Sequence, residues 1–447
     1  MEKLAILGGT PLMANDGKCP KEYLFKWPII TQEDEDAALE VIRSGKFSAT
    51  NISMEFEKEF AQWLGVKHAL TFCNGTQSLA AAMFAVGLGA GDEIICTTKT
   101  YWASITPALI FGATPVFCNF DKNLSMDPDD LERCITPRTK AIMVVHYCAY
   151  PCDMDRIMAI AKKHNLIVIE DVSHAQGGRY KGKRLGTFGH IAGMSMMSEK
   201  SFAVGECGML VTNDDNLYER AVAYGHYERN NAKFLSVNEE LKEFYGLPLG
   251  GVKARLNQVS AAIGRVQLKH YDDRCAEIDK AMSYYWDLIE EIPGLRAIRT
   301  EKGSGSTMGG WYANKGIYDP EKFHGLPVTK FCDAVSAEMN GNARIWAGAN
   351  FCLHTHNLFK KFDFRHAGKP STIEYMDAAE YYGNEGCERS LVDNAFSGLW
   401  FKHYDKEWIE KFAACVKKVA ENHEQLLDAE FEEKSKGGRW FGTSDEA

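Results

Sequence analysis

The strongest constraint on the fold is a regular alternation of strand-like and helix-like segments between residues 69 and 214 of the 447-residue chain. Short apolar runs alternate there with longer stretches of helical pattern. Alternation at these lengths is typical of βαβ units, in which right-handed crossover helices join parallel strands. The sequence therefore predicts an α/β fold with a mainly parallel sheet. About seven strands are expected before residue 215, among them 69–73, 93–97, 114–120, 141–147, 166–171 and 209–211, with helices at 33–43, 54–64, 77–88, 101–111, 154–164 and 217–224.

The sequence pattern changes after residue 215. Residues 226–255 are rich in loop-forming residues, and residues 257–289 have the pattern of one long helix leading into a second domain. That domain is expected to be smaller and α+β, with a strand at 343–347 and a terminal helix at 408–427. A chain of this length exceeds what one core usually supports. The expected division is an N-terminal arm (1–25), a large domain (26–256), a bridging helix with a small C-terminal domain (257–430) and a mobile tail (431–447).

Two charged side chains stand where the predicted sheet would bind a ligand. The apolar run at 166–171 ends in Glu170 and Asp171, at the carboxyl edge where open α/β sheets bind ligands, and Lys200 follows in a glycine-rich segment. A buried carboxylate needs a facing cation or donor. A protonated pyridine nitrogen would satisfy Asp171 and an aldehyde would satisfy Lys200, which indicates pyridoxal 5′-phosphate. A lone lysine near a cleft is otherwise more often a solvated surface residue.

A second segment has the form of an anion site. Residues 72–77 have the pattern of a strand end, a glycine turn and a helix start. The first amides of a helix and its positive dipole end favour a phosphate. Taken alone, Gly75 and Thr76 are equally consistent with a simple helix cap.

These segments resemble the DegT/StrS class of sugar aminotransferases, and the resemblance runs from about Trp27 to the residues around Tyr404. The signature of that family is a strand ending in Glu-Asp, a Gln or His three residues later, Ser-x4-Lys and Gly-Glu-Gly-Gly, with Gly-Thr-x-x-Leu near the first strand. The matching residues here are Glu170-Asp171, His174, Ser195 with Lys200, Gly205-Glu206-Cys207-Gly208, and Gly75, Thr76 and Leu79.

The resemblance implies a type I fold of the pyridoxal-phosphate-dependent aminotransferases. It also implies a homodimer with shared active sites that serves sugar or aminocyclitol biosynthesis. The expected reaction moves an amino group from glutamate or glutamine to a keto-sugar or a keto-cyclitol such as an inosose. The acceptor stays open between a nucleotide-linked sugar and a free cyclitol; a diphosphate would need a basic groove, for which Arg229 and Arg255 are the nearest candidates.

The resemblance also assigns roles to individual residues. Lys200 would form the Schiff base with the cofactor and then move the proton in the transfer step. Asp171 would hold the pyridine nitrogen protonated, and His174 would contact the 3-oxygen side of the ring. Ser195, with the Gly75-Thr76 turn, would bind the phosphate.

Three further positions concern a ring contact and two departures from the family pattern. Trp102 matches an aromatic residue that stacks on the pyridine ring, although a tryptophan there is about as often core. Cys207 replaces a glycine of the family pattern. Lys253 stands where the family commonly has an asparagine that reaches the partner subunit's cofactor phosphate, and an ammonium would bind a phosphate more strongly.

Charge and composition argue against several classes of function. The net charge of −10 does not suit nucleic acid or an anionic membrane as a main partner. The 13 cysteines are scattered, so we expect reduced thiols and no metal site. We expect a soluble cytoplasmic protein, because neither a signal-peptide pattern nor a run of membrane-spanning length is present. No Gly-x-Gly-x-x-Gly follows an early strand, which argues against a nicotinamide oxidoreductase.

Two alternatives keep the fold but change the function. A sugar dehydratase of the same family is disfavoured because such enzymes carry histidine in place of the Schiff-base lysine. A non-catalytic regulator is disfavoured because Asp171, Ser195 and Lys200 are all present.

Overall fold

The large part of the molecule is built on a seven-stranded sheet. The structure, a computed structural model, describes residues 2–356, 358–361 and 391–435. The strand order is β1-β9-β8-β5-β4-β2-β3, and only β9 runs antiparallel to its neighbours. The predicted α/β class with a mainly parallel sheet is therefore confirmed. The strands are β1 (His68–Phe72), β2 (Glu93–Thr97), β3 (Thr114–Cys118), β4 (Thr139–Val145), β5 (Ile167–Asp171), β8 (Ile191–Ser195) and β9 (Gly208–Thr212).

Helices cover both faces of this sheet, so most strand residues are buried and apolar. Successive side chains of β1 point to opposite faces. Leu70 and Phe72 share a core cluster with α4 (Gly75–Ala85), whereas Ala69 packs in another cluster with α3 (Asn51–Leu64). Every residue of β2, β3 and β9 is buried. Further helices of this part are α2 (Gln32–Ser44), α6 (Pro128–Arg133), α7 (Met154–His164) and α8 (Asp215–Gly225), with a two-stranded ribbon of β6 (Arg179–Tyr180) and β7 (Lys183–Arg184).

One predicted helix is wrong. Residues 101–111 form a single 3₁₀ turn, η2 (Trp102–Ser104), followed by the short helix α5 (Pro107–Ile110). Ile105, with φ −132°, leaves the helical region between them. Pro107 has no N–H to donate to the preceding turn, so the helix restarts at the proline instead of continuing.

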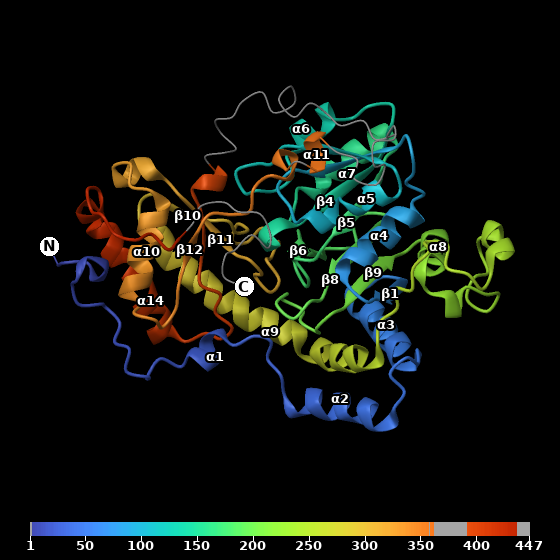
Figure 1. Ribbon diagram of the computed structural model, residues 1–447, viewed down its shortest axis with the longest axis horizontal. Helices are drawn as coiled ribbons and strands as arrows, with labels where there is room; N and C mark the ends of the chain where they lie inside the picture. The colour runs from blue at the N-terminus through green and yellow to red at the C-terminus, as the bar shows by residue number, and fades with distance from the viewer. Residues whose placement is uncertain (1, 357, 362–390, 436–447) are drawn as a thin grey trace.

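The long helix α9 (Gln258–Glu290) leads from the first sheet to a second, four-stranded antiparallel one (Figure 1). The order of this smaller sheet is β10-β11-β13-β12, and α10 (Val328–Glu338) and α14 (Lys406–Glu421) pack in its core cluster. The smaller α+β unit is confirmed, but its predicted strand at 343–347 shortens to two residues. The strands are β10 (Leu295–Ala297), β11 (Lys315–Tyr318), β12 (Trp346–Ala347) and β13 (Ala395–Ser397).

Residues 2–25 pack against this smaller unit. Leu4, Met13 and Leu24 belong to the same apolar cluster as α10 and α14. The buried carboxylate of Glu338 accepts hydrogen bonds from the amides of Ala5 and Leu12, both at 2.8 Å. At the C-terminal end of the described chain, the amide of Ser435 donates a hydrogen bond to Asp333. Residues 436–447 of the predicted tail lie outside the described residues. The boundaries of the domains stay a prediction.

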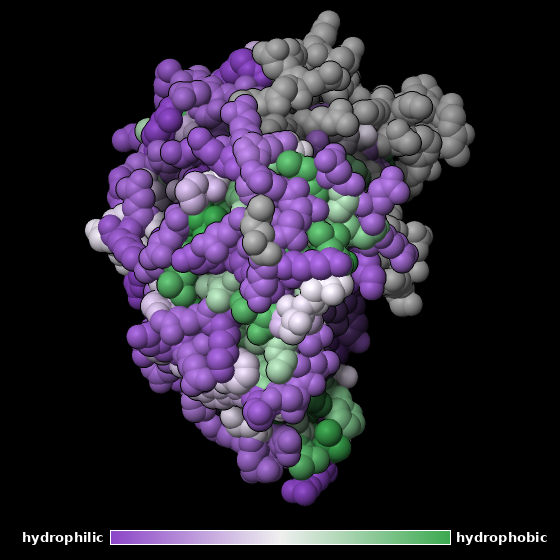
Figure 2. Space-filling view, turned by 90° about the vertical axis from the view of Figure 1, so that its left-hand side faces the viewer, coloured by the Kyte–Doolittle hydropathy of each residue, from purple (hydrophilic) through white to green (hydrophobic). Residues whose placement is uncertain are grey.

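Figure 2 shows the face on the side of α10 and α14, which is mostly hydrophilic with hydrophobic residues gathered in separate patches. Within the described ranges, no helix combines the length and apolar character needed to cross a bilayer. The same ranges hold no group of three or more His, Cys, Asp or Glu side chains placed to bind a metal ion.

Candidate active site

A cavity of about 530 Å³ lies at the carboxyl ends of the parallel strands. Its walls come from the loops after β1, β2, β4, β5 and β8, and from β11, β12 and β13 of the smaller sheet. This is the position and size expected of a ligand site in an open α/β sheet. The cavity brings together six of the eight predicted site residues: Gly75, Thr76, Asp171, His174, Ser195 and Lys200.

The two carboxylates that end β5 face opposite sides of the sheet. Asp171 lines the cavity, is 4% exposed, and accepts hydrogen bonds from Ser104 Oγ (2.7 Å) and the amide of Ser173 (3.0 Å). These two donors leave part of the carboxylate facing the cavity. Asp171 is therefore a fixed anion beside the space that a ligand would fill.

Glu170 points away from the cavity and holds a loop. It accepts hydrogen bonds from the amides of Gly186 (2.8 Å), Phe188 (2.8 Å) and Gly189 (2.7 Å), and lies 3.1 Å from Nε2 of His146. Burial opposes its charge, but these hydrogen bonds outweigh burial and lower the pKa of Glu170. Its role is structural.

Lys200 is a buried amine in the same cavity. It is 8% exposed, and its Nζ lies 4.2 Å from the centroid of the Tyr312 ring. Burial lowers the pKa of Lys200 to about 8, against the opposing charges of Asp171 and Glu199. An appreciable fraction of the amine is therefore unprotonated near neutral pH, which is the form that attacks a carbonyl carbon.

His174 is a neutral donor facing the cavity. Its Nδ1 accepts a hydrogen bond from the amide of Cys148 at 3.3 Å, so the ring proton lies on Nε2. Burial lowers the pKa of His174 well below its usual value, and the charges of Lys200 and Lys315 lower it further. The ring contacts Tyr312, with 4.8 Å between centroids.

The start of α4 meets the end of β8 closely enough to form an anion cradle. A Cβ at Gly75 would lie 2.4 Å from Ser195 Cβ, so only glycine permits this approach. Asn74 caps the helix by accepting from the amide of Gln77 at 2.9 Å. The amides of the first turn have no partner within the helix. Together with the hydroxyls of Thr76 and Ser195 they suit a phosphate group.

Cys207, which replaces a glycine of the family pattern, fits its turn without backbone strain. The left-handed backbone position of this turn is at Gly205, with φ +125°, and Cys207 is not in that region. Gly208 is the glycine needed for close approach, since a Cβ there would lie 2.2 Å from the Asn74 carbonyl oxygen. The thiol of Cys207 is fully buried, 3.8 Å from Met196 Sδ, and burial raises its pKa. It is a structural thiol.

Two predicted residues do not line the cavity. Trp102 is 38% exposed and packs on Tyr101, with ring centroids 5.0 Å apart, and it is Tyr101 that lines the cavity. Lys253 lies with Arg255 beside the ring of Tyr227, at 5.8 and 5.4 Å from its centroid. Lys253 is not among the described residues that line the cavity of its own subunit.

Several lining residues were not predicted from the sequence. Ser104 follows a strand without any distinguishing pattern. Tyr312, Lys315, Trp346 and Ser397 come from the smaller unit, and only the tertiary fold brings them to the large sheet. No local signal near these four residues distinguishes them from ordinary strand and loop positions.

The chain is similar to known aminotransferases in sequence and in structure. The model of the DegT/DnrJ/EryC1/StrS aminotransferase family matches residues 28–369. GDP-perosamine synthase of Caulobacter vibrioides is 38% identical over 261 residues, covering 58% of this chain and 67% of that protein. A putative L-glutamine:3-amino-2,3-dideoxy-scyllo-inosose aminotransferase of Micromonospora echinospora is 31% identical over 346 residues, covering 75% and 78%. The X-ray structure of the aminotransferase from Psychrobacter cryohalolentis gives a TM-score of 0.75 at 29% identity, covering 89% of this chain and 99% of that one.

Proposed function

The chain belongs to the DegT/DnrJ/EryC1/StrS aminotransferase family, and we propose that it moves an amino group from glutamate or glutamine to the ketone of a sugar or cyclitol, with pyridoxal phosphate as cofactor. The observation that carries the proposal is one cavity that holds a fixed carboxylate, Asp171, and a buried amine of lowered pKa, Lys200. A carboxylate for a pyridine nitrogen and an amine for an aldehyde are the two groups that this cofactor requires.

The other residues of the cavity fit the remaining groups of the cofactor. The first turn of α4, with Thr76 and Ser195, would hold the phosphate, and Nε2–H of His174 would be the donor to the ring oxygen. When bound, the cofactor supplies a protonated pyridine ring that withdraws electrons from the carbon being deprotonated.

The protein's own steps in the reaction are binding and proton transfer. Asp171 would accept the hydrogen bond from the ring nitrogen, and Ser104 Oγ and the amide of Ser173 donate hydrogen bonds that keep its carboxylate oriented. Nζ of Lys200, once free, would take the proton from the α-carbon of the donor and deliver it to the carbon on the other side of the reacting nitrogen. Burial keeps the pKa of Lys200 near the working pH, which suits a group that must both accept and donate.

An acceptor of sugar or cyclitol type suits the lining of the cavity. The tyrosines Tyr101, Tyr147 and Tyr312 offer flat faces and hydroxyl groups, as polyol recognition requires. Arg229, the first candidate for binding a diphosphate, is 2% exposed and pairs with Glu57 at 2.7 Å, so that prediction is wrong. Among the described residues that line the cavity there is no arginine, which favours a free cyclitol or the sugar end of a larger acceptor.

The two half-reactions test this function. Holoenzyme mixed with L-glutamate or L-glutamine should lose the visible absorbance of its bound aldehyde cofactor, and a matching keto-sugar or inosose should restore it. Recovery with ordinary 2-oxo acids alone, and with no ketose or inosose, would identify an amino-acid transaminase instead.

We also propose a homodimer in which residues 226–255 complete the partner's site. This segment projects beyond α8 (Figure 1) and exposes apolar side chains: Val237 is 48%, Phe244 50% and Leu247 71% exposed. Exposed apolar groups gathered in one segment are typical of a protein interface. At the start of the same segment, both ring nitrogens of His226 are buried and make no hydrogen bond within the described part of the chain.

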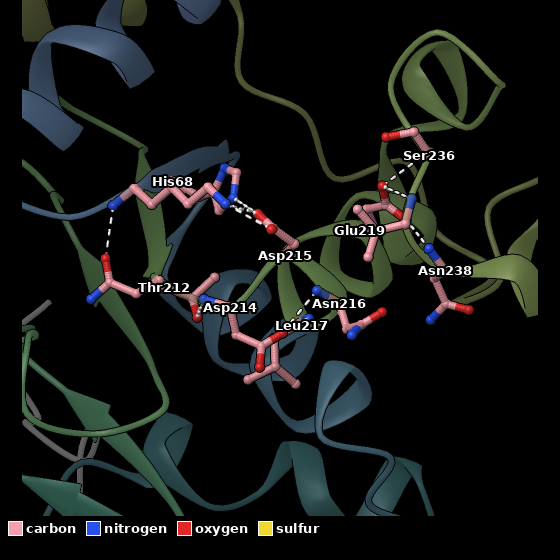
Figure 3. A network of polar contacts seen from close by, with 12 residues as sticks. His68, Thr212, Asp214, Asp215, Asn216, Leu217, Glu219, Ser236 and Asn238 are labelled. Atoms are coloured by element: carbon pink, nitrogen blue, oxygen red, sulfur yellow. Dashed lines mark hydrogen bonds and ion pairs between the residues drawn. The ribbon is translucent and has the colours of Figure 1, made fainter.

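The segment is firmly attached although it projects. Figure 3 shows the carboxylate of Glu219 on α8 accepting hydrogen bonds from the amides of Ser236 and Asn238, at 2.5 and 2.7 Å. The amide of Val237 also donates to Glu219, at 2.8 Å. A fixed loop loses little entropy when a second subunit binds it, which favours the dimer.

Lys253→Ala should weaken retention of the cofactor by about tenfold or more, because it removes a charge-assisted contact to the partner subunit's cofactor phosphate. Equilibrium dialysis of the holoenzyme measures the change, and Lys233→Ala, an exposed lysine of the same segment, is the matched control. A fully active monomer at assay concentration, or unchanged retention in the Lys253→Ala protein, would contradict the shared site.

A further inference from the structure

Trp346 is a partly exposed tryptophan on the wall that the smaller sheet gives to the cavity. It belongs to a row of three side chains, in which Ser397 on β13 is paired with Lys315 on β11 and with Trp346 on β12. Residues directly opposite one another in a sheet share a face, and all three line the cavity. The indole is 37% exposed, so part of its ring surface is left for a ligand.

One face of this indole is covered by a guanidinium group. Cζ of Arg344 lies 3.5 Å from the centroid of the Trp346 ring, a distance that places it over a face of the ring and not at its edge. Nη2 of the same arginine lies 3.5 Å from Oδ1 of Asp333 on α10. Asp333 is 6% exposed and accepts hydrogen bonds from the amides of Lys434 and Ser435, at 2.6 and 2.9 Å. The indole therefore has a fixed support on one side.

The opposite face of Trp346 is the one left to the cavity. Trp346 lines the cavity, whereas Arg344 is not among the described residues that do so. The residues that follow the tryptophan, Ala347, Gly348 and Ala349, line the cavity as well, and their small side chains leave room beside the ring. A fixed aromatic face suits a ligand ring that presents C–H groups to it, because the face carries the negative end of the ring quadrupole.

The position of Trp346 relates it to a substrate and not to the cofactor. The groups proposed to hold the cofactor, among them Asp171 and Lys200, come from the large sheet and its loops, so the wall of the smaller sheet faces the space left for a substrate. Glutamate and glutamine are open chains without a ring. A sugar or cyclitol has a ring whose C–H groups form apolar patches between its hydroxyls.

We propose that the ring of the sugar or cyclitol acceptor stacks on Trp346, that Arg344 positions the indole, and that this platform selects a cyclic ketone over an open-chain 2-oxo acid; this rests on the function proposed above. Stacking removes apolar surface of both rings from water, and a stacked ring is held in one orientation relative to the reacting groups. An open-chain 2-oxo acid gains little from the same face.

The test compares Trp346→Leu, which keeps an apolar side chain but loses the flat face, with wild-type holoenzyme in separate half-reactions. For the ketose or inosose that wild-type enzyme accepts, the apparent dissociation constant should rise about tenfold or more, the usual effect of removing an aromatic anchor. For L-glutamate it should change less than about threefold, by the same criterion. Trp346→Phe, with a smaller flat face, should lie between the two. Trp408→Leu is the matched control and should equal wild type, because Trp408 also carries a cation, Lys411 Nζ at 4.1 Å from its ring centroid, but is not among the described lining residues.

A double-mutant cycle tests the positioning role of Arg344. Arg344→Gln should weaken acceptor binding by about threefold to tenfold, because the indole loses its support. The same substitution should have no further effect in the Trp346→Leu protein, since no indole is left to position. Equal effects in both backgrounds would contradict this role.

A binding measurement that needs no turnover separates this inference from the proposed function. Saturation-transfer NMR with scyllo-inositol, a cyclitol whose two ring faces carry only C–H groups, should give a signal with wild-type holoenzyme and a much weaker one with Trp346→Leu. Sorbitol, an open-chain polyol, should give little signal with either. If the Trp346→Leu protein does not fold, Trp346→Phe provides the comparison. No scyllo-inositol signal with wild type, equal signals in the folded variants, or equal losses in both half-reactions would overturn the inference. Failure of wild-type enzyme to react with any ketone, with the scyllo-inositol signal intact, would count against the proposed function alone.

Discussion

Lys200→Ala should lose turnover by at least roughly 10²–10⁴-fold, since one group supplies both the covalent link to the cofactor and the proton transfer. The variant should also lack the visible absorbance of the lysine-bound cofactor. The fold should survive, because the side chain lies in the cavity, where its Nζ contacts the Tyr312 ring, while the backbone carbonyl that accepts a hydrogen bond from Trp27 Nε1 at 2.7 Å is unchanged. Steady-state assays and absorbance spectra measure both effects.

A second buried lysine is the matched control for that substitution. Burial lowers the pKa of Lys99 to about 8 as well, and its Nζ donates to the carbonyl of Asn350. Lys99→Met should keep the cofactor absorbance, because Lys99 is not among the described residues that line the cavity and its Nζ donates to the carbonyl of Asn350. Wild-type absorbance and turnover in the Lys200→Ala protein would rule out Lys200 as the reactive lysine.

Asp171→Asn should lower turnover by about 10²–10³-fold, the usual effect of removing one oriented electrostatic group from an active site. An amide of the same shape retains the packing but no longer keeps a pyridine nitrogen protonated. The single-turnover rate with L-glutamate, measured at saturating cofactor, isolates this effect from cofactor loss.

The neighbouring carboxylate provides the control for Asp171. Glu170→Gln should lower the thermal midpoint, because three amides and His146 lose their charged partner, yet leave the rate per folded holoenzyme near wild type. If Asp171→Asn stayed within threefold of wild type, the carboxylate would have no part in the chemistry.

The features that local sequence specifies were predicted well. Strand β2 has the predicted bounds of 93–97, and the long helix predicted at 257–289 is α9 (Gln258–Glu290). Asp171 and Lys200 were predicted because, for each, the residues nearby in sequence are enough to indicate a ligand site. Their meeting in one cavity follows from parallel strands ending at one edge.

The sequence did not reveal which strands pair, or in what register, and so it missed the features that depend on strand pairing. Lys315, Ser397 and Trp346 are far apart in sequence, and only the register of β11, β13 and β12 forms the row. The period of two along a strand places Glu170 and Asp171 on opposite faces, so only one of that pair faces a ligand. Trp102 was assigned from the resemblance alone, and in the structure its neighbour Tyr101 is the residue that lines the cavity.

The central claim is that Lys200 is the lysine that carries the cofactor, and chemical reactivity alone does not single it out. Burial lowers the pKa of Lys99, Lys200 and Lys402, so each has an amine able to attack an aldehyde. The most direct measurement is borohydride reduction of the holoenzyme, followed by proteolysis and mass mapping of the pyridoxyl group. We predict one modified peptide, with the group on Lys200. Modification of Lys99 or Lys402 in its place, or of no lysine, would contradict the assignment.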